Sequence, residues 1–460
     1  MQRRQIKIKR GLTLPIAGAP VSDAGAKDGG DPRPIRSVAL LGPDYRGLKP
    51  TLKVTQGDRV RLGQTLFEDK SNPGVKFTAP AAGTVSAVNR GARRALISVV
   101  IQLESDDEIQ FPRYEVDQLP LLDRDAVRTS LLDSGLWTAL RKRPYGKIPS
   151  PEAEPAALFI TAMDSNPLAV DPGDLVQRHG ADLNAGILAL SRLLGGPVYF
   201  CCAPTAATDE VVDLPDDRLR LVEFSGPHPS GLPGTHIHFL NPVAAEGPEA
   251  WYLDLQDAIA IGKLFLTGRL WTRRYVTLAG PRAANPRRVE TRLGANITDL
   301  CRDEVKPGPQ RLISGSVFNG HQARDYMDYL GRYARQVTAL EEGERRRFFG
   351  WLAPGSDRYS AINAFVSRLG RRRDFPLTTS QNGSPRAMVP IGNFEKVLPL
   401  DMLPAPLLKS LIVRDTDSAQ ALGCMELDDE DLALCSFVCP SKYDYGGFLV
   451  EALAQIEKEG

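Results

Sequence analysis

The spacing of hydrophobic residues changes several times along the chain, and each change marks a different kind of element. Apolar residues at alternating positions predict a short strand at Ile6–Ile8 and a β-rich module over residues 35–103. Helical spacing follows over Leu121–Leu140, and four prolines between 144 and 155 predict an extended connector. The N-terminal part is therefore expected to form a β-rich module, which a helix and a connector separate from the next domain.

From residue 156 onward, predicted strands alternate with predicted helices. Strands are expected at Ala157–Thr161, Val198–Phe200, Leu219–Phe224 and Tyr275–Leu278, and helices at Asp182–Leu194 and Trp251–Leu266. This alternation is typical of a parallel sheet covered by helices. A small β-grasp-like unit is expected over 288–319, and an irregular helical region follows residue 331. The sequence thus predicts a multidomain α/β protein.

The segment Lys53–Val85 has the strand and turn pattern of a barrel-sandwich hybrid, the β-sandwich of biotinyl- and lipoyl-type carrier domains. Such domains present a modifiable lysine at a hairpin tip. The lysine here, Lys70, follows Gly63 closely, and Asn72-Pro73-Gly74 turns the chain directly after it. We therefore expect that Lys70 does not reach such a tip and that the module is structural. Modification of Lys70 stays an alternative, which an intact mass would test.

Composition narrows the class of protein. With 460 residues, 42% hydrophobic and 25% charged, the chain has the composition of a soluble multidomain protein. A net charge of +1 gives no reason to expect nucleic acid as a partner. We find no apolar run long enough for a membrane span and no secretory signal. The six cysteines, two of them adjacent at Cys201-Cys202, favour a reducing, cytoplasmic compartment over a disulfide framework.

Common nucleotide-binding and nucleophile motifs are absent from the sequence, but two segments resemble active-site motifs with replaced residues. Asp133–Leu140 is similar to the glycine-rich FMN/NADH loop found in the flavoprotein subunit of respiratory complex I and in the C subunit of the Rnf complex. Gly135 remains, whereas side chains from Thr138 onward occupy the rest of the loop, so we expect no flavin in the usual mode. Thr161–Pro167 resembles the acidic ExEP segment of the same relatives, with Asn166 at one acid position. We favour a strand-end turn there over a nucleotide contact.

A third segment resembles an iron–sulfur motif that is incomplete. Cys424, Cys435 and Cys439 supply three thiols where a [4Fe–4S] cluster commonly needs four, and acidic residues surround them. We therefore expect no cluster, although whether these cysteines hold any metal stays open. His228, His236 and His238 are a possible zinc set, the last two alternating on a predicted strand. A structural role is favoured, since no carboxylate or thiolate lies close in sequence.

Longer segments carry a more specific resemblance, spread over nearly the whole chain. Ile6–Gly18, Gly226–His238, Gln256–Leu264 and Asp417–Cys424 are similar to segments of the A-subunit family of sodium-translocating NADH:quinone reductases. The resemblance implies a sandwich module (1–110), a Rossmann-like α/β domain (111–260), an SLBB-like β-grasp domain (261–335) and a C-terminal helical domain (336–460).

The resemblance also implies a function. A member of this family is expected to be a peripheral subunit on the cytoplasmic face of the bacterial inner membrane, without flavin, haem or iron–sulfur centre of its own. The complex would oxidise NADH, reduce ubiquinone and export Na⁺, with flavins and iron–sulfur centres in the other five subunits. The expected main partner is the B subunit, which lies in the membrane and reduces the quinone. An electron-transfer subunit that retains NADH and FMN, or a scaffold without any ligand site, remains an alternative.

The candidate quinone contact is the basic loop at residues 140–147. Arg143 and Lys147 could donate hydrogen bonds to a quinone carbonyl, and Tyr145 could pack on the ring. Leu40 and Tyr45 are expected to join them at the junction with the sandwich. Two arginine triplets, 345–347 and 371–373, could meet anionic lipid or RNA, but we favour exposed helix faces for them.

Overall fold

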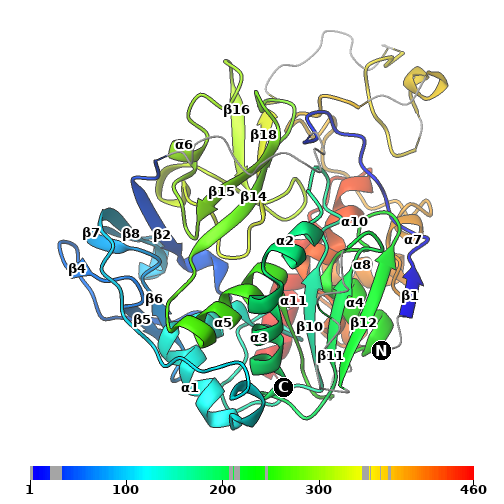
Figure 1. The fold of residues 1–460 in the computed structure, drawn as a ribbon. Coiled ribbons are helices and arrows are strands. Elements are labelled where there is room, and N and C mark those ends of the chain that lie inside the picture. Colours follow the sequence, from blue (N-terminus) through cyan, green and yellow to red (C-terminus); the bar gives the residue numbers. More distant parts are fainter. Residues whose placement is uncertain are drawn as a thin grey trace.

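The computed structural model describes residues 4–20, 34–206, 211, 218–243, 247–343, 352, 354–362, 364–370 and 374–459 (Figure 1). Most of the Gly/Pro/Asp-rich loop at 21–34 and both arginine triplets lie outside these residues. The described chain forms a β-sandwich, a mostly parallel α/β sheet, a five-stranded mixed sheet and a group of C-terminal helices. The predicted fold class is therefore confirmed.

The sandwich contains two antiparallel sheets. One has the strand order β2-β8-β7-β4 and the other β3-β5-β6. Their bounds are β2 (Ser37–Leu41), β3 (Pro50–Leu52), β4 (Arg59–Val60), β5 (Thr65–Asp69), β6 (Lys76–Thr78), β7 (Ala82–Arg90) and β8 (Leu96–Ser105). Apolar side chains such as Leu66, Val85 and Ile101 fill the space between the sheets. This packing explains the alternating pattern of the sequence, because alternate residues of a strand face the same side.

Lys70 comes before the turn at Asn72-Pro73-Gly74, as the sequence predicted, at the start of the connection between β5 and β6, where it is exposed. The connection is nevertheless held against the rest of the molecule. The backbone N–H of Lys70 donates to Lys49 O, and Asn72 Nδ2 donates to Ile148 O and Pro149 O. Modification of Lys70 stays an untested alternative.

The α/β sheet has the order β1-β12-β11-β10-β13-β9 and is parallel except for β9. Its strands are β1 (Arg4–Lys7), β9 (Arg141–Arg143), β10 (Ala157–Ala162), β11 (Val198–Cys202), β12 (Leu219–Ser225) and β13 (Ala250–Asp254). Helices α3 (Gly180–Ser191) and α5 (Leu255–Thr267) pack against the face that carries Leu158 and Ile160. Helix α4 (Pro233–Leu240) covers the opposite face, next to Phe159. Helices α1 (Arg124–Ser134) and α2 (Gly173–Arg178) precede these.

Two predictions for this domain need correction. Trp251–Asp254 belong to β13, and the helix begins only at Leu255. The strand is buried on both faces, so its apolar run has no period-two alternation and resembles a buried helix. His236 and His238 lie on α4, not on a strand. Pro233 in the first turn of α4 is the local signal for that helix.

The third unit is a five-stranded sheet with the order β15-β14-β18-β16-β17 (Figure 1). Its strands are β14 (Arg273–Ala279), β15 (Arg287–Arg292), β16 (Gln310–Ser314), β17 (His321–Gln322) and β18 (Gln336–Glu341), with the short helix α6 (Ile297–Leu300) beside them. Strand β18 pairs with both β14 and β16. The sheet therefore continues past residue 335, where the sequence placed the end of this domain.

The C-terminal helices build a separate apolar core around Leu407, Leu427 and Leu449. They are α7 (Phe394–Val397), α8 (Pro404–Val413), α9 (Thr416–Ala421), α10 (Ala433–Val438) and α11 (Tyr445–Glu459). Helix α10 and the acidic stretch before it face both the α/β sheet and the five-stranded sheet domain, which places a cavity between the three units.

Candidate functional site

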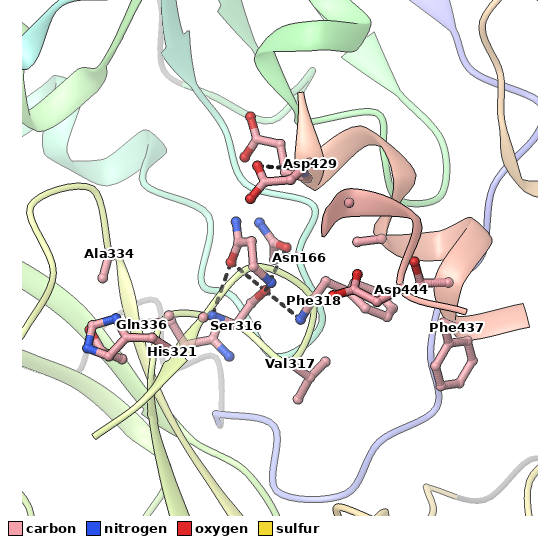
Figure 2. A pocket seen from close by; sticks show the side chains of 18 of the residues that line it. Asn166, Ser316, Val317, Phe318, His321, Ala334, Gln336, Asp429, Phe437 and Asp444 are labelled. Carbon is pink, nitrogen blue, oxygen red and sulfur yellow. Dashed lines mark hydrogen bonds between the residues drawn. The ribbon is translucent and has the colours of Figure 1, made fainter. Parts of the chain in front are cut away.

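A cavity of about 1510 Å³ lies where the α/β sheet, the five-stranded sheet domain and the C-terminal helices meet (Figure 2). Asp164 and Asn166, which follow β10, and Asp254, which ends β13, line one side of it. The chain lays β11 and β12 on one side of β10 and then β13 on the other. The cavity is therefore located outside the carboxyl ends of β10 and β13, at the switch point where α/β sheets commonly bind ligands.

Asn166 joins two of the walls. Its backbone N–H and its Nδ2 each donate to Asp164 Oδ1 at 2.9 Å, which closes a tight turn after β10. Ser316 Oγ, from the loop after β16, donates to Asn166 Oδ1 at 3.0 Å (Figure 2). These contacts confirm the strand-end turn that the sequence predicted.

The charged groups that line the same wall are paired with one another. Asp257 accepts from Arg274 at 2.5 Å and from Arg332 at 3.0 Å. Arg335 pairs with Asp254 at 2.8 Å and with Asp164 at 3.4 Å. Burial alone would lower the pKa of Arg335, but the two carboxylates hold it above its ordinary value. Each of these guanidinium groups already has a carboxylate partner, so the wall carries little unmatched charge.

Two neutral polar side chains on the cavity wall have unused hydrogen-bonding capacity. Thr161 Oγ1 and Gln336 Oε1 are buried and have no hydrogen-bond partner among the described residues. The amide nitrogen of Gln336 donates to Pro167 O and Thr338 Oγ1, which fixes the side chain and leaves its oxygen as the open acceptor. Buried polar groups are rarely left unpaired, so a ligand or ordered water is expected beside them.

The opposite side of the cavity is aromatic. Phe318 and Phe437 meet edge to face with ring centroids 5.7 Å apart, and Tyr359 stacks on Phe437 at 6.3 Å. The cavity therefore combines an aromatic wall, two unpartnered neutral polar groups and a set of neutralised charges. This combination suits a neutral ligand with an apolar body and a few polar atoms.

The residues predicted from the sequence as a quinone contact fall into two separate places. Arg143 is fully buried in β9 and pairs with Asp431 at 2.8 Å, and Lys147 pairs with Glu457. Tyr145 packs against the C-terminal helices, whereas Leu40 and Tyr45 lie in the core of the sandwich. Arg143, Tyr145 and Lys147 do not line the large cavity, while their neighbours Arg141 and Gly146 do.

Side chains fill the space beside Asp133–Leu140, the segment that resembles a glycine-rich loop. The guanidinium of Arg141 lies between the rings of Tyr252 and Tyr333, at 5.2 and 4.9 Å from their centroids. It also pairs with the buried Asp428 at 2.9 Å. A cation between two rings and beside a carboxylate is held in place, so this part of the cleft is occupied by protein.

Gly135, in that segment, has a structural reason to be glycine. It ends α1 in the left-handed conformation with φ 78°, and an added Cβ would lie 2.4 Å from Thr78 Oγ1. We expect Gly135→Ala to lower the free energy of unfolding by roughly 1–3 kcal/mol, from the backbone conformation and the clash together. Urea unfolding measures this loss. Thr78→Gly in the same chain should recover the part due to the clash, and an unchanged stability of Gly135→Ala would contradict the assignment.

The three histidines point to different partners. His236 Nε2 donates to Ser230 O at 3.0 Å, His228 Nδ1 lies 3.1 Å from Ser165 Oγ, and His238 Nδ1 lies 3.0 Å from Glu426 Oε2. Within the described ranges, no group of three His, Cys, Asp or Glu side chains is arranged to hold a metal ion. All six cysteines are buried and none forms a disulfide, and burial raises the pKa of Cys424 to about 12. A thiol of that kind stays protonated near neutral pH.

Comparison with known proteins adds sequence relationships to this geometry. Family models match residues 6–104 (NqrA N-terminal barrel-sandwich hybrid domain), 122–270 (NqrA second alpha/beta domain) and 275–325 (NQRA C-terminal domain). The A subunit of the Na(+)-translocating NADH-quinone reductase of Pseudomonas aeruginosa strain UCBPP-PA14 is 54% identical over 458 residues, which cover 99% of this chain and 100% of that protein. The corresponding proteins of Pasteurella multocida and Hahella chejuensis are 52% and 51% identical over 456 residues, with the same coverage. An NAD⁺-reducing [NiFe]-hydrogenase structure matches about half of each chain at 13% identity and a TM-score of 0.34, too low to support any argument.

The fold and the matched domains define a class of respiratory-complex subunit, built from a barrel-sandwich hybrid, a second α/β domain and an SLBB-type domain. None of the helices in the described part of the chain has the length and apolar character needed to cross a bilayer. The chain belongs to the NqrA family, the family of the A subunit of the Na(+)-translocating NADH-quinone reductase.

Proposed function

We propose that this chain is a peripheral subunit, on the cytoplasmic face of the bacterial inner membrane, of a complex that reduces ubiquinone with NADH and exports Na⁺. In this proposal the large cavity binds the quinone headgroup or a competing inhibitor. The chain carries no flavin or iron–sulfur centre, and electrons pass through the other five subunits to the quinone-reducing B subunit in the membrane.

One observation carries the ligand part of this proposal, the chemistry of the cavity wall. A quinone is an uncharged ring with two carbonyl acceptors, so it needs a donor, an apolar surface and no counter-charge. Thr161 Oγ1 is an unpartnered donor, and Phe318 and Phe437 supply the apolar surface. Phosphate-bearing cofactors such as FMN or NADH need unpaired cations or backbone N–H groups. Arg274, Arg332 and Arg335 are each paired with carboxylates, so this wall of the cavity does not favour a phosphate group.

Replacing Thr161 by valine tests this assignment. Valine keeps the shape and removes the hydroxyl, so we expect a short-chain ubiquinone or a competing inhibitor to bind the purified chain up to about tenfold more weakly. Thr84→Val on β7 of the sandwich is the matched control and should leave the dissociation constant unchanged. Calorimetry or quenching of intrinsic fluorescence would measure it.

Lys147→Ala tests which of two sites binds the quinone, the cavity or the basic loop at residues 140–147 that the sequence predicted. Weaker binding in Lys147→Ala but not in Thr161→Val would assign the quinone to the contact formed by Arg143, Tyr145 and Lys147 and would reject the cavity. Equal affinity in all variants would reject both. A stoichiometric flavin spectrum of the purified chain, or saturable micromolar binding of FMN or NADH, would overturn the cofactor-free part and favour an electron-transfer subunit.

A further inference from the structure

Exposed apolar side chains gather in one short part of the chain beside the cavity. Leu352, Ile362, Val366 and Leu369 belong to the twelve large apolar side chains that are most exposed among the described residues. Leu369 is 85% exposed, the highest value in this set. The stretch is the gold trace that extends away from the packed domains at the upper right of Figure 1. Scattered apolar residues need no explanation, but these four fall within 18 residues of one another, and we call them the apolar patch.

The patch is attached to the cavity wall. Tyr359, Ile362 and Phe365 line the cavity, and Tyr359 stacks on Phe437 and lies 5.9 Å from the ring of Phe375. The 3₁₀ turn Val366–Leu369 follows directly and turns its apolar side chains outward. The middle of the stretch is thus packed against the protein, and its two ends present apolar side chains to the outside.

The charge of the surrounding sequence is strongly polarised. Residues 345–373 contain eight arginines and one acidic residue, Asp357, a balance of +7. Since the whole chain has a net charge of +1, the remaining residues carry −6. Surfaces that lie on an anionic bilayer combine exposed apolar side chains with basic residues. The apolar patch and the basic segment around it have this combination.

We infer that the described residues of this stretch, 352, 354–362 and 364–369, dock this protein on a bilayer that contains anionic phospholipid, with Val366 and Leu369 inserted among the headgroups. This interaction does not depend on whether the cavity binds quinone. A lipid surface fits better than an acidic protein partner alone, because exposed side chains such as Leu369 gain nothing from charge and need an apolar environment.

Vesicle sedimentation of the full chain tests the proposal. We expect binding to vesicles of phosphatidylglycerol and phosphatidylethanolamine that weakens as salt is added, and little binding to phosphatidylcholine vesicles. The double substitution Val366→Ser/Leu369→Ser should lower the partition coefficient about tenfold. Leu121→Ser is the matched control, because Leu121 is 82% exposed but ends the 3₁₀ turn Leu119–Leu121 before α1. Equal binding of the double variant and the unmodified chain would overturn the proposal, as would absence of binding to the anionic vesicles.

A spectroscopic readout guards against indirect effects of the substitutions. The six native cysteines are buried, so a cysteine placed at Val366 can be labelled selectively with a polarity-sensitive dye. Its emission should shift to shorter wavelength on anionic vesicles, whereas a dye at Leu121→Cys should not shift. Loss of assembly with the other subunits in the double variant, with vesicle binding unchanged, would assign the patch to a protein partner and overturn the lipid assignment.

Discussion

Arg143→Ala is expected to lower the free energy of unfolding by about 3–5 kcal/mol, the cost of breaking a buried ion pair from one side. The guanidinium is fully buried, and it pairs with Asp431 at 2.8 Å, Glu430 at 3.4 Å and Asp428 at 3.9 Å. Burial alone would lower the pKa of Arg143, but these carboxylates, Asp431 first, hold it well above its ordinary value. Without Arg143, Asp431 would remain in the interior with no cation at that distance. Urea unfolding at pH 7.5 measures the loss.

Lys147→Ala is the matched control for that experiment. Lys147 lies four residues further along the same loop and pairs with Glu457, but both side chains are partly exposed. Exposed ion pairs typically contribute less than about 1 kcal/mol, so this variant should unfold nearly as the unmodified chain does. A loss below about 1 kcal/mol in Arg143→Ala as well would mean that the acidic segment 428–431 does not depend on this arginine. Because Arg143 holds β9 to the C-terminal helices, its substitution cannot report cleanly on quinone binding.

Local patterns in the sequence were sufficient for most of the fold but not for its edges. The β-rich sandwich module as a whole and the strands β10, β11 and β12 have apolar patterns that their own burial explains, and they were predicted. Strand β9 is Arg141-Lys142-Arg143, three charged residues that no strand propensity favours. Its charges are compensated by Glu249 and by acids near residue 430, more than 100 residues away. Likewise, Ile6 was predicted as strand, but its pairing with Phe224 in the α/β sheet follows only from the tertiary fold.

The candidate site was predictable only in part, for a topological reason. The segment that resembles an acidic active-site motif contains Asp164 and Asn166, which line the cavity, but the sequence favoured a strand-end turn over a ligand contact there. The switch point, however, exists only because β13 lies on the other side of β10 from β11, and the sequence does not state strand order. Phe437 lies between Cys435 and Cys439 of the incomplete iron–sulfur motif, and Phe318 and Gln336 come from two further segments without a motif of their own. Their convergence depends on how three domains pack, which no local pattern encodes.

His236→Gln is expected to reduce the loss of stability that the protein suffers in mild acid. His236 is fully buried on α4, and burial lowers its pKa from 6.5 to about 3. The folded protein therefore keeps the ring neutral while the unfolded chain takes up a proton below pH 6.5. The stability contribution of the neutral ring is complete above pH 6.5 and is lost as the pH falls toward 3. Between pH 7.5 and pH 5, the titration of this one residue should lower the free energy of unfolding by about 2 kcal/mol.

Glutamine isolates this titration because its amide can keep the hydrogen bond that His236 Nε2 donates to Ser230 O, while it binds no proton in this range. Urea unfolding at a series of pH values should give a shallower dependence for His236→Gln than for the unmodified chain, whatever the variant's stability at pH 7.5. His228, whose pKa burial lowers to about 4, offers an independent second case, and the double variant should be shallower still. An identical dependence of the unfolding free energy on pH in the unmodified chain, His236→Gln and the double variant would show that neither ring is held neutral by the fold. That result would thereby contradict the buried packing of α4 on β12 and on the loop before it, where His236 meets Phe224 and Ser230.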